Sequence, residues 1–440
     1  MPADEVIEGG GGALIPGLHD HHVHLLSAAA ALTSTECGPP RVRDLAELAT
    51  ALQEAAGSRD WVRGVDYHES VAGPLDRYVL DSLVADRPVR VQHRSGALWI
   101  LNSRALDLVA GVLDDSGDVE REESGTPTGR LWRFDARLRQ VVASTPPDLA
   151  ALGRRLTTYG ITGVTDATPD VDDIGLTVIA AACRSGDLPV HVTHLGVRTG
   201  TATDRISSGP RKLLLRDHDL PTYDDLQSTI EQEHDAGRPV AVHCVTRESL
   251  LLTLAVLEDV GCLPGDRIEH ASIVPHGVAQ EMARLGVRVV TQPGFLHDRG
   301  DDYLRELAPE DRGLLYPFES LRQAGVRVTA SSDAPFGELD PWATIRAAVE
   351  RRTAGGQVIG PSECVSPMTA LDGYLGSPLD PGGPPRRVTP GSPADLCLLH
   401  VPLEIALRNP SSEVVRTVTF GGRALARHST GTITVDRENN

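Results

Sequence analysis

Four histidines and one aspartate lie within six positions near the start of the chain, in the stretch Pro16-Gly17-Leu18-His19-Asp20-His21-His22-Val23-His24-Leu25. In an extended strand, successive side chains point to opposite faces. Two imidazoles on one face, two residues apart, can share a metal ion, because neutral histidine is a common ligand for zinc-like ions. A His-x-His pair alone is a weak motif, and a polar turn or a surface histidine cluster explains it equally well. The stretch therefore leaves two candidate pairs open. Alternation would place Asp20, His22 and His24 on one face and His19 and His21 on the other.

The chain contains a single lysine, Lys212, although lysine and arginine together number 42. Lysine can lose its proton and act as a nucleophile, whereas a guanidinium group stays charged. Lys212 also lies in the apolar run Arg-Lys-Leu-Leu-Leu, where a charged side chain is costly unless it is paired. This favours a chemical role that arginine could not fill, with an ordinary surface lysine as the alternative.

From about residue 148 onward, helical and strand patterns alternate, which is typical of a parallel sheet. With 13–22 counted as the first strand, eight strands are predicted, as a closed (β/α)8 barrel of the α/β class requires. The other strands are 163–166, 189–195, 211–215, 239–243, 267–270, 287–292 and 326–333, and the helices are 148–159, 174–184, 222–236, 247–260, 276–285 and 318–324.

The remaining segments predict an insertion and a small β domain. The insertion covers about 27–147 and contains a helix at 43–56, a strand at 88–93, a strand-to-helix passage at 98–108 and a charged loop at 120–128. Near the C-terminus, a Pro/Gly linker at 378–385 precedes a strand within 388–399 and a hairpin at 414–425. We therefore expect a small β domain from residues 1–15 and 380–440, and a barrel from 16–379 that contains the insertion.

Residues of metal-ligand type close five of the predicted strands. Active sites of such barrels lie at the carboxyl ends of the strands, so these side chains are expected to converge. One polar strand end is ordinary, but five that face the same barrel mouth predict a metal site. The residues are His22 and His24 on the first strand, Lys212 on the fourth, His243 on the fifth, His270 on the sixth and Asp333 on the eighth.

These motifs resemble the amidohydrolase superfamily, and the long insertion is similar to the amidohydrolase family 3 branch, which includes N-substituted formamide deformylases. The similarity runs from about residue 13 to 425 and also rests on Ser95-Gly96, Asn102-Ser103, Ala105-Leu106, Gly125-Thr126-Pro127-Thr128-Gly129, Ser332-Asp333-Ala334-Pro335 and Pro390-Gly391-Ser392-Pro393-Ala394-Asp395-Leu396. It implies a (β/α)8 barrel with a reduced β-sandwich domain built from both termini. It also selects His22 and His24 as the ligand pair.

The resemblance further implies a set of roles. His22 and His24 would hold one metal ion, and His243 and His270 a second. Lys212 would carry a CO2-derived carbamate that bridges the ions, and Asp333 would ligate the first ion and move protons. One or two divalent ions are expected, zinc first, with manganese and iron as alternatives.

The function expected from such a site is hydrolysis of an amide or related C–N bond in a small molecule by metal-activated hydroxide. Three alternatives stay open. They are a deaminase, a lactone or phosphoester hydrolase that uses the same metal site, and a catalytically silent binding protein.

Substrate contacts are expected from two regions. The insertion would contribute His93, Arg94 and Trp99, and the segment after the seventh strand would contribute Gln292 and His297. For each of them, packing or a surface position is the alternative. The family usually has a histidine after the Ser-Gly pair, where this chain has Ala97, so the family's substrate specificity does not carry over directly.

The composition of the chain restricts its expected binding partners and its expected location in the cell. A net charge of −19 argues against nucleic acid and anionic membranes. The six cysteines are scattered without a Cys-x-x-Cys pair, which indicates a reducing compartment. The sequence shows no signal-type N-terminus and no apolar run of membrane-spanning length. We therefore expect a cytoplasmic protein with a small-molecule substrate, no nucleic-acid or membrane partner, and a homodimeric state.

Overall fold

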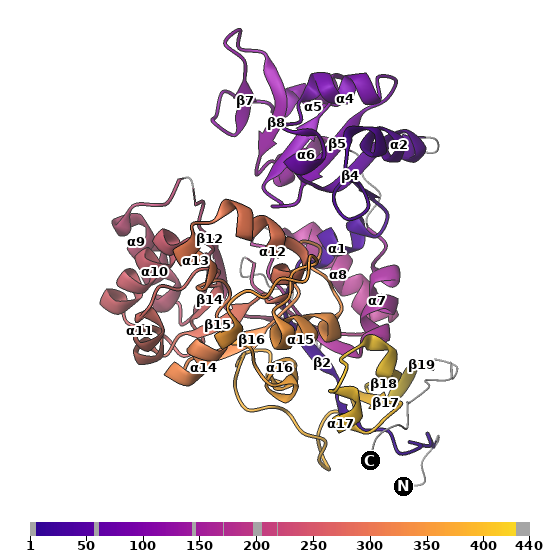
Figure 1. Cartoon of the computed structure of the whole chain (residues 1–440), viewed down its shortest axis with the longest axis vertical. Helices are drawn as coiled ribbons and strands as arrows, with labels where there is room; N and C mark the ends of the chain where they lie inside the picture. The colour runs from indigo at the N-terminus through magenta and orange to yellow at the C-terminus, as the bar shows by residue number, and fades with distance from the viewer. Residues whose placement is uncertain are drawn as a thin grey trace. The chain divides into compact units, whose positions relative to one another are not determined.

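The computed structural model describes residues 6–56, 61–142, 147–169, 171–196, 205–217 and 219–427. Its contacts divide the chain into two compact units (Figure 1). Residues 1–25 and 149–440 form the first, here called the main unit, and residues 26–148 form the second, the inserted unit. Among the described residues, no helix is long and apolar enough to cross a membrane.

Two parallel sheets make up the centre of the main unit and confirm the predicted α/β class. Every strand predicted for the barrel occurs, and β11 is an addition. In sheet order, the first sheet contains β11 (Ile206–Ser208), β10 (His191–His194), β9 (Ile161–Asp166) and β2 (Leu18–Val23). The second contains β12 (Arg211–Leu214), β13 (Val240–Cys244), β14 (Arg267–His270), β15 (Arg288–Thr291) and β16 (Arg327–Ala330).

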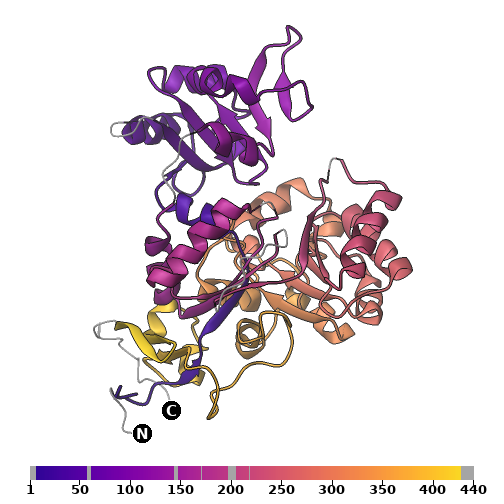
Figure 2. The ribbon, with the colours of Figure 1, turned by 180° about the vertical axis from the view of Figure 1, so that it is seen from behind.

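Backbone hydrogen bonds connect the two parallel sheets at both of their ends. The Lys212 N–H, on β12, donates to the carbonyl of Leu195, just after β10, at 2.8 Å. At the other end, the His24 N–H donates to the Ala334 carbonyl at 2.8 Å, and Val23 forms a parallel bridge with Ala334. In Figures 1 and 2, the indigo strand β2 accordingly lies between strands from the middle and the late parts of the chain.

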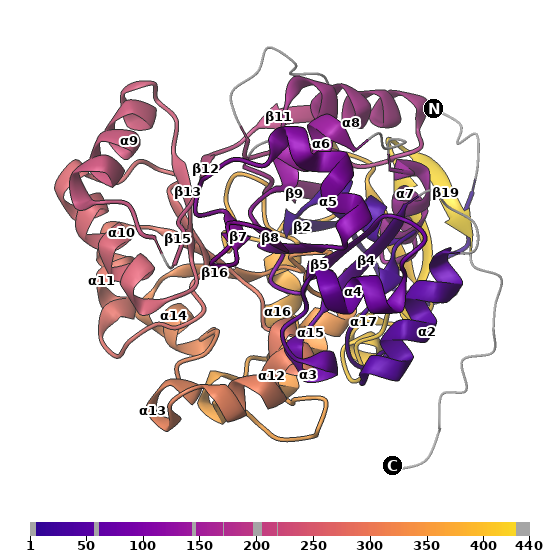
Figure 3. The same ribbon diagram turned by 90° about the horizontal axis from the view of Figure 1, so that it is seen from above.

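Helices follow most of these strands, as the alternating pattern predicted. Figure 3 shows α9, α10, α11 and α14 along the outer side of β12–β16. Local capping explains where several of them begin; at α10, Thr246 and Ser249 form a reciprocal capping box. The helices are α7 (Leu149–Thr158), α8 (Asp173–Ser185), α9 (Tyr223–Asp235), α10 (Arg247–Val260), α11 (Val278–Leu285), α12 (Gly294–Glu306), α13 (Pro309–Arg312), α14 (Glu319–Ala324), α15 (Pro341–Glu350), α16 (Pro367–Tyr374) and α17 (Leu403–Ala406).

A separate antiparallel sheet joins the two ends of the chain. It contains β1 (Leu14–Pro16), β17 (Leu396–Leu399), β18 (Val415–Phe420) and β19 (Arg423–Arg427), in that order. The hairpin predicted at 414–425 is confirmed as β18 and β19. The described residues of this region form one sheet, and the β-sandwich stays a prediction.

The first predicted strand, 13–22, is in fact two strands divided at Gly17. β1 pairs with β17, whereas β2 pairs with β9. A Cβ atom at Gly17 would lie 2.2 Å from Thr162 Oγ1. The segments around Gly17 and Thr162 can therefore approach this closely only because Gly17 has no side chain. The strand changes sheets where glycine allows it.

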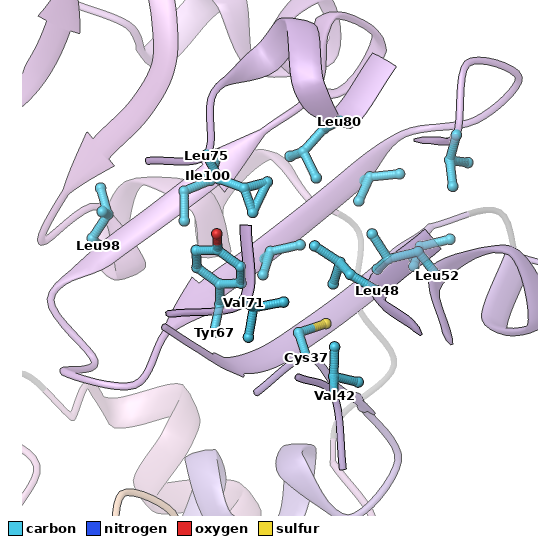
Figure 4. Packing of buried hydrophobic residues seen from close by; sticks show 14 residues of the cluster. Cys37, Val42, Leu48, Leu52, Tyr67, Val71, Leu75, Leu80, Leu98 and Ile100 are labelled. Atoms are coloured by element: carbon cyan, nitrogen blue, oxygen red, sulfur yellow. The ribbon is translucent and has the colours of Figure 1, made fainter. Parts of the chain in front are cut away.

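The inserted unit is built on a six-stranded mixed sheet in the order β3 (Thr35–Glu36), β4 (Val62–Tyr67), β5 (Val89–His93), β6 (Leu98–Leu101), β8 (Pro127–Trp132) and β7 (Val119–Arg121). Figure 4 shows its core, in which Leu48 and Leu52 of α2 (Leu45–Ala56) lie with Tyr67 and Ile100 from the sheet. The other helices are α1 (Leu25–Ala31), α3 (Glu69–Ala72), α4 (Arg77–Leu83), α5 (Ser103–Val109) and α6 (Asp135–Val141).

One prediction for the inserted unit holds only for residues 122–126, which connect two strands. Residues 120–128 were expected to form a loop, but they include the end of β7 and the start of β8, where Arg121 pairs with Pro127. The hairpin is partly exposed and carries charged side chains, so its sequence lacks the apolar alternation that marks a half-buried strand.

Candidate metal centre

Three of the predicted ligands meet where β2 and β16 end. The ligand atoms of His22, His24 and Asp333 all lie within 4.8 Å of one another. His22 Nε2 lies 3.4 Å from Asp333 Oδ1, and His24 Nε2 lies 3.3 Å from the same oxygen. One carboxylate oxygen thus faces two imidazole nitrogens from a neighbouring segment. Together these three atoms form a donor set that can bind a single metal ion.

The second predicted histidine pair lies beside the first. The ring centroids of His243 and His270 are 4.5 Å apart, and those of His22 and His270 are 4.9 Å apart. His270 Nδ1 is 3.9 Å from Asp333 Oδ2, the second oxygen of the same carboxylate. The structure therefore brings four histidines and one aspartate from the ends of four strands into one cluster.

Two members of the cluster have left-handed backbone conformations. The φ angle is 54° at Asp333 and 72° at His270. Residues with a side chain rarely adopt such angles, and when they do the positions are concentrated at functional sites. His270 is the last residue of β14, and Asp333 follows the end of β16 by three residues.

Lys212 contributes a buried amine to the same region. Its side chain is almost fully buried, and Nζ has no hydrogen-bond partner among the described residues. Burial lowers the pKa of Lys212 to about 8, against the opposing effect of the Glu269 and Asp333 carboxylates. A substantial share of this amine is therefore neutral at slightly alkaline pH.

Glu269, which the sequence analysis did not single out, lies directly behind the cluster. Its carboxylate bonds to His22 Nδ1 and accepts a hydrogen bond from Arg267 Nε at 2.5 Å. Arg267 in turn donates from Nη2 to the His21 carbonyl at 3.1 Å. Burial would raise the pKa of Glu269, but Arg267, Lys212 and His22 outweigh it and hold that pKa well below its usual value.

A sequence signal for this pair did exist. Arg267 and Glu269 are two residues apart in a short strand whose four residues are all buried. Side chains at i and i+2 share a face, so a buried cation and anion at this spacing are placed to pair.

The register of β2 differs from the regular alternation that was predicted. Pairing with β9 shifts between Asp20 and Val23, so strict alternation does not hold through the histidine run. The rings of His19 and His21 lie 4.6 Å apart, and His22 and His24 form the other pair. Asp20 Oδ1 accepts from the backbone N–H of His22 and from that of Ser332, at 3.1 and 3.2 Å.

Gln292 supports a ligand in this structure. It is fully buried, its Oε1 lies 2.7 Å from His270 Nδ1, and its Nε2 donates to Ser331 Oγ at 2.9 Å. With Nδ1 engaged in this way, Nε2 of His270 is the nitrogen left for a metal ion. The other predicted contact, His297, is exposed on α12, with Nδ1 3.3 Å from the Arg352 carbonyl.

The three predicted contacts in the inserted unit have local partners there. His93 Nε2 lies 3.0 Å from Glu69 Oε2. The Trp99 indole is buried and donates to Asp135 Oδ1 at 2.9 Å. The Arg94 backbone N–H donates to the Tyr67 carbonyl at 2.8 Å. A substrate contact for any of them stays a prediction.

The residues of the cluster fit a divalent metal ion. His22 Nε2, Asp333 Oδ1 and Lys212 Nζ are all buried and form no hydrogen bond with the described part of the chain. Burial lowers the pKa of His22 to about 3 and that of His243 well below its usual value, so both imidazoles are neutral and can donate a lone pair. Unpartnered buried polar atoms are costly, and a cation would satisfy the imidazole nitrogen and the carboxylate oxygen.

These features define an α/β protein with a candidate metal centre at the ends of its parallel strands. Residues 5–426 match the model of the amidohydrolase family, and the chain belongs to this family, as its motifs predicted. It is 28% identical to an N-substituted formamide deformylase from Arthrobacter pascens over 87% of this chain and 82% of that protein.

Two solved structures share the fold. One is an uncharacterized metal-dependent hydrolase from Pyrococcus horikoshii OT3, with a TM-score of 0.68 and 21% identity over 96% of this chain and 90% of that one. The other is an uncharacterized metal-dependent hydrolase from Pyrococcus furiosus, with a TM-score of 0.63 and 22% identity over 84% of this chain and 83% of that one.

Proposed function

We propose that this protein is a metal-dependent hydrolase that cleaves an amide or a related C–N bond of a small molecule. The observation that carries the proposal is the set of buried donor atoms without hydrogen-bond partners, His22 Nε2, Asp333 Oδ1 and Lys212 Nζ. Membership of the amidohydrolase family supports it, as does the similarity to a deformylase that acts on N-substituted formamides.

In this proposal, His22, His24 and Asp333 hold one divalent ion, and His243 and His270 hold a second. Zinc suits this mixture of nitrogen and oxygen donors, with manganese or iron as alternatives. Bound there, the ions would polarise a carbonyl oxygen and lower the pKa of water.

Lys212 would bridge the two ions as a carbamate. The neutral amine is the form that reacts with CO2, and a pKa of about 8 keeps part of Lys212 in that form near neutral pH. Uncarboxylated, the lysine would bring a positive charge next to two cations, whereas the carbamate brings a negative charge that separates them.

Asp333 would transfer protons during the reaction. Neighbouring His22, His24 and His270 outweigh burial and hold the pKa of Asp333 below its usual value, so the group is a carboxylate. It would accept a proton from the attacking water and return it to the leaving nitrogen.

We also infer that the two parallel sheets are parts of one eight-stranded barrel. The backbone hydrogen bonds at both of their ends support this arrangement, with β11 as an added strand beside β10.

The proposal further includes a small β domain from residues 1–15 and 380–440, a cytoplasmic location and a homodimeric state. The net charge of −19 agrees with a partner other than nucleic acid.

Metal analysis and a screen of N-acyl and N-formyl compounds test the proposal. We expect close to two metal ions per chain and hydrolysis of at least one amide class.

Lys212→Ala should lower both metal content and activity, and a short carboxylic acid such as acetate should partly restore them. Lys212→Met, which fills the space left by alanine, is the matched control for loss of packing, because added acid should not fit there. Unchanged metal content and activity in Lys212→Ala would overturn the carbamate bridge, and a metal-free protein without amide hydrolysis would overturn the function.

A further inference from the structure

Two arginines lie next to each other on the sheet of the inserted unit. Arg63 of β4 and Arg90 of β5 are register partners on parallel strands, and both side chains are only partly buried. The residues before them, Val62 and Val89, belong to the apolar core beneath α2, so strand alternation places the two arginines on the opposite face of the sheet. Like charges at neighbouring positions of adjacent strands repel, so the sheet carries this pair at a cost.

Both guanidinium groups lie over the ring of Trp99. The distance to the ring centroid is 5.4 Å for Arg63 and 5.2 Å for Arg90. The Arg90 guanidinium also lies 5.9 Å from the ring centroid of Trp61, whose side chain is partly exposed. An aromatic face attracts a cation but accepts no hydrogen bond from the N–H groups that point outward in the guanidinium plane. These contacts therefore hold the two groups without using their donors.

Arg90 differs in one respect from the other arginines that lie over aromatic rings. Each of the others also forms a hydrogen bond or an ion pair. Within the described ranges, Arg90 forms neither, and its Nε is buried without a partner. The other arginines over rings are Arg63, Arg77, Arg130, Arg137, Arg205 and Arg299.

Arg130 of the same sheet shows what a fully engaged arginine looks like. It lies 5.9 Å from the ring centroid of Trp132, as Arg90 does from that of Trp61. Arg130 Nε also pairs with Glu120 Oε2 at 3.0 Å, and Nη1 donates to the Leu75 carbonyl at 3.0 Å. Arg90 has the ring contacts alone.

The charge of the arginine pair is only partly balanced. Asp135 favours the charged form of both guanidinium groups, and its Oδ1 already accepts a hydrogen bond from the Trp99 indole. Burial lowers the pKa of Arg63 to about 10, and the charge of Arg90 lowers it further, so Arg63 stays protonated near neutral pH. The chain has 61 acidic residues against 42 basic ones, so the shortfall is local and does not reflect a lack of carboxylates.

We propose that Arg63 and Arg90 bind a small oxyanion, a carboxylate or a phosphate, beside the rings of Trp61 and Trp99. A guanidinium group offers parallel N–H donors that match two oxygens of either anion. Such an anion would supply the missing negative charge and engage the unused donors of Arg90. Because the rings hold the guanidinium planes beforehand, little ordering is needed on binding. The proposal concerns the inserted unit and does not depend on the proposed hydrolase function.

Calorimetric titration of the full-length protein with inorganic phosphate and with benzoate, in a buffer free of other oxyanions, tests the proposal. We expect at least one of the two to bind and to change the tryptophan fluorescence. Phosphate alone would assign a phosphate site, and benzoate alone a carboxylate site. In Arg90→Met the affinity should fall by at least about tenfold, the range for losing a charge-assisted hydrogen bond. Arg90→Lys keeps the charge without the planar fork and should give an intermediate affinity.

Arg130→Met is the matched control, because it removes an arginine that lies over a tryptophan but already has partners. It should lower the melting temperature and leave the anion affinity unchanged. Arg90→Met, which removes a like-charge repulsion, should melt no lower than the wild type in the absence of anion. A saturating anion should raise the melting temperature of the wild type by about 2–4 °C and that of Arg90→Met by much less.

Three results would overturn the proposal. One is the absence of binding of both anions to the wild type. Another is an anion affinity of Arg90→Met within about threefold of the wild type, because the binding would then belong elsewhere, for instance to the candidate metal centre. The third is a lower melting temperature of Arg90→Met without anion together with an unchanged response to anion, which would make the role of Arg90 structural. If Arg90→Met does not fold, Arg90→Lys decides, and a wild-type affinity in that variant would count against the site.

Discussion

Replacing Glu269 with glutamine tests whether this buried carboxylate orients His22 toward the metal site. The carboxylate lies between His22 Nδ1 and Arg267 Nε, and the side chains of all three residues are at most 1% exposed. Glutamine has the same shape and can still accept one hydrogen bond, so the change removes charge more than volume. Carboxylates that hold a ligating histidine typically account for 10- to 100-fold in metal affinity, about 1.4–2.8 kcal/mol.

The same change should also weaken the folded metal-free protein. In Glu269→Gln, the Arg267 guanidinium stays charged and buried with a neutral partner. A hydrogen bond to a charged group contributes about 1.5–3 kcal/mol, so we expect the free energy of unfolding to fall by about 2 kcal/mol. Arg267→Met should destabilise by at least as much, because it leaves the Glu269 charge buried without its guanidinium partner.

A double variant separates stability from positioning. Glu269→Gln combined with Arg267→Met removes both charges, so its unfolding free energy should exceed the value expected from adding the two single effects by about 1–3 kcal/mol. Zinc affinity should not recover in the same way, since the carboxylate behind His22 is still missing. Urea unfolding of the metal-free proteins and competition for zinc with a chromophoric chelator measure the two quantities. A zinc dissociation constant within threefold of the wild type in Glu269→Gln would refute the positioning role.

Two further predictions concern the folded protein without metal. Burial lowers the pKa values of His21 and His22 from 6.5 to about 3, so between these pH values the unfolded chain binds more protons than the folded one. Burial raises the pKa of the Asp20 carboxyl to about 6, which acts in the opposite direction and offsets the contribution of one histidine. Unfolding free energy from urea titrations should therefore decrease as pH falls from 6.5 to 4, by roughly 1 kcal/mol per pH unit in total, and a flat profile would contradict this. Gly17→Ala should destabilise by about 1–3 kcal/mol, because its Cβ would lie 2.2 Å from Thr162 Oγ1. Gly9→Ala, which meets no atom within 4 Å, is the control and should change the melting temperature little.

Most parallel strands of the main unit were predictable because they are short runs with clear boundaries that alternate with helical patterns. Their order and their ends then indicated where polar side chains would gather. The division at Gly17 was predictable only in part, because the expected domain boundary after residue 15 lies at the Pro16-Gly17 pair. The partners of the two strands were not predictable, because β1 pairs with β17 and β2 with β9, each more than a hundred positions away in sequence.

The metal ligands were likewise easier to predict from the sequence than the residues that hold them in place. His22, His24 and Asp333 could be named because each ends a strand, and the structure brings them together. The role of Glu269 depends on His22, which lies 247 residues away in sequence. Likewise Gln292 looked like a substrate contact because it follows a strand, but its amide is engaged by His270 and Ser331, which only the folded arrangement shows.

The two buried cations of the site show why lysine and arginine are not interchangeable here. Arg267 is held by Glu269 and by the His21 carbonyl. In general, a guanidinium stays charged where an amine can lose its proton. Among the described residues, Lys212 Nζ has no such hydrogen-bond partners, and burial lowers its pKa to about 8. The same burial therefore produces a fixed charge at one position and a reactive amine at the other. An arginine at position 212 would add a second permanent cation to the cluster and oppose metal binding. Under the proposed function, this would account for the single lysine in a chain that otherwise uses arginine.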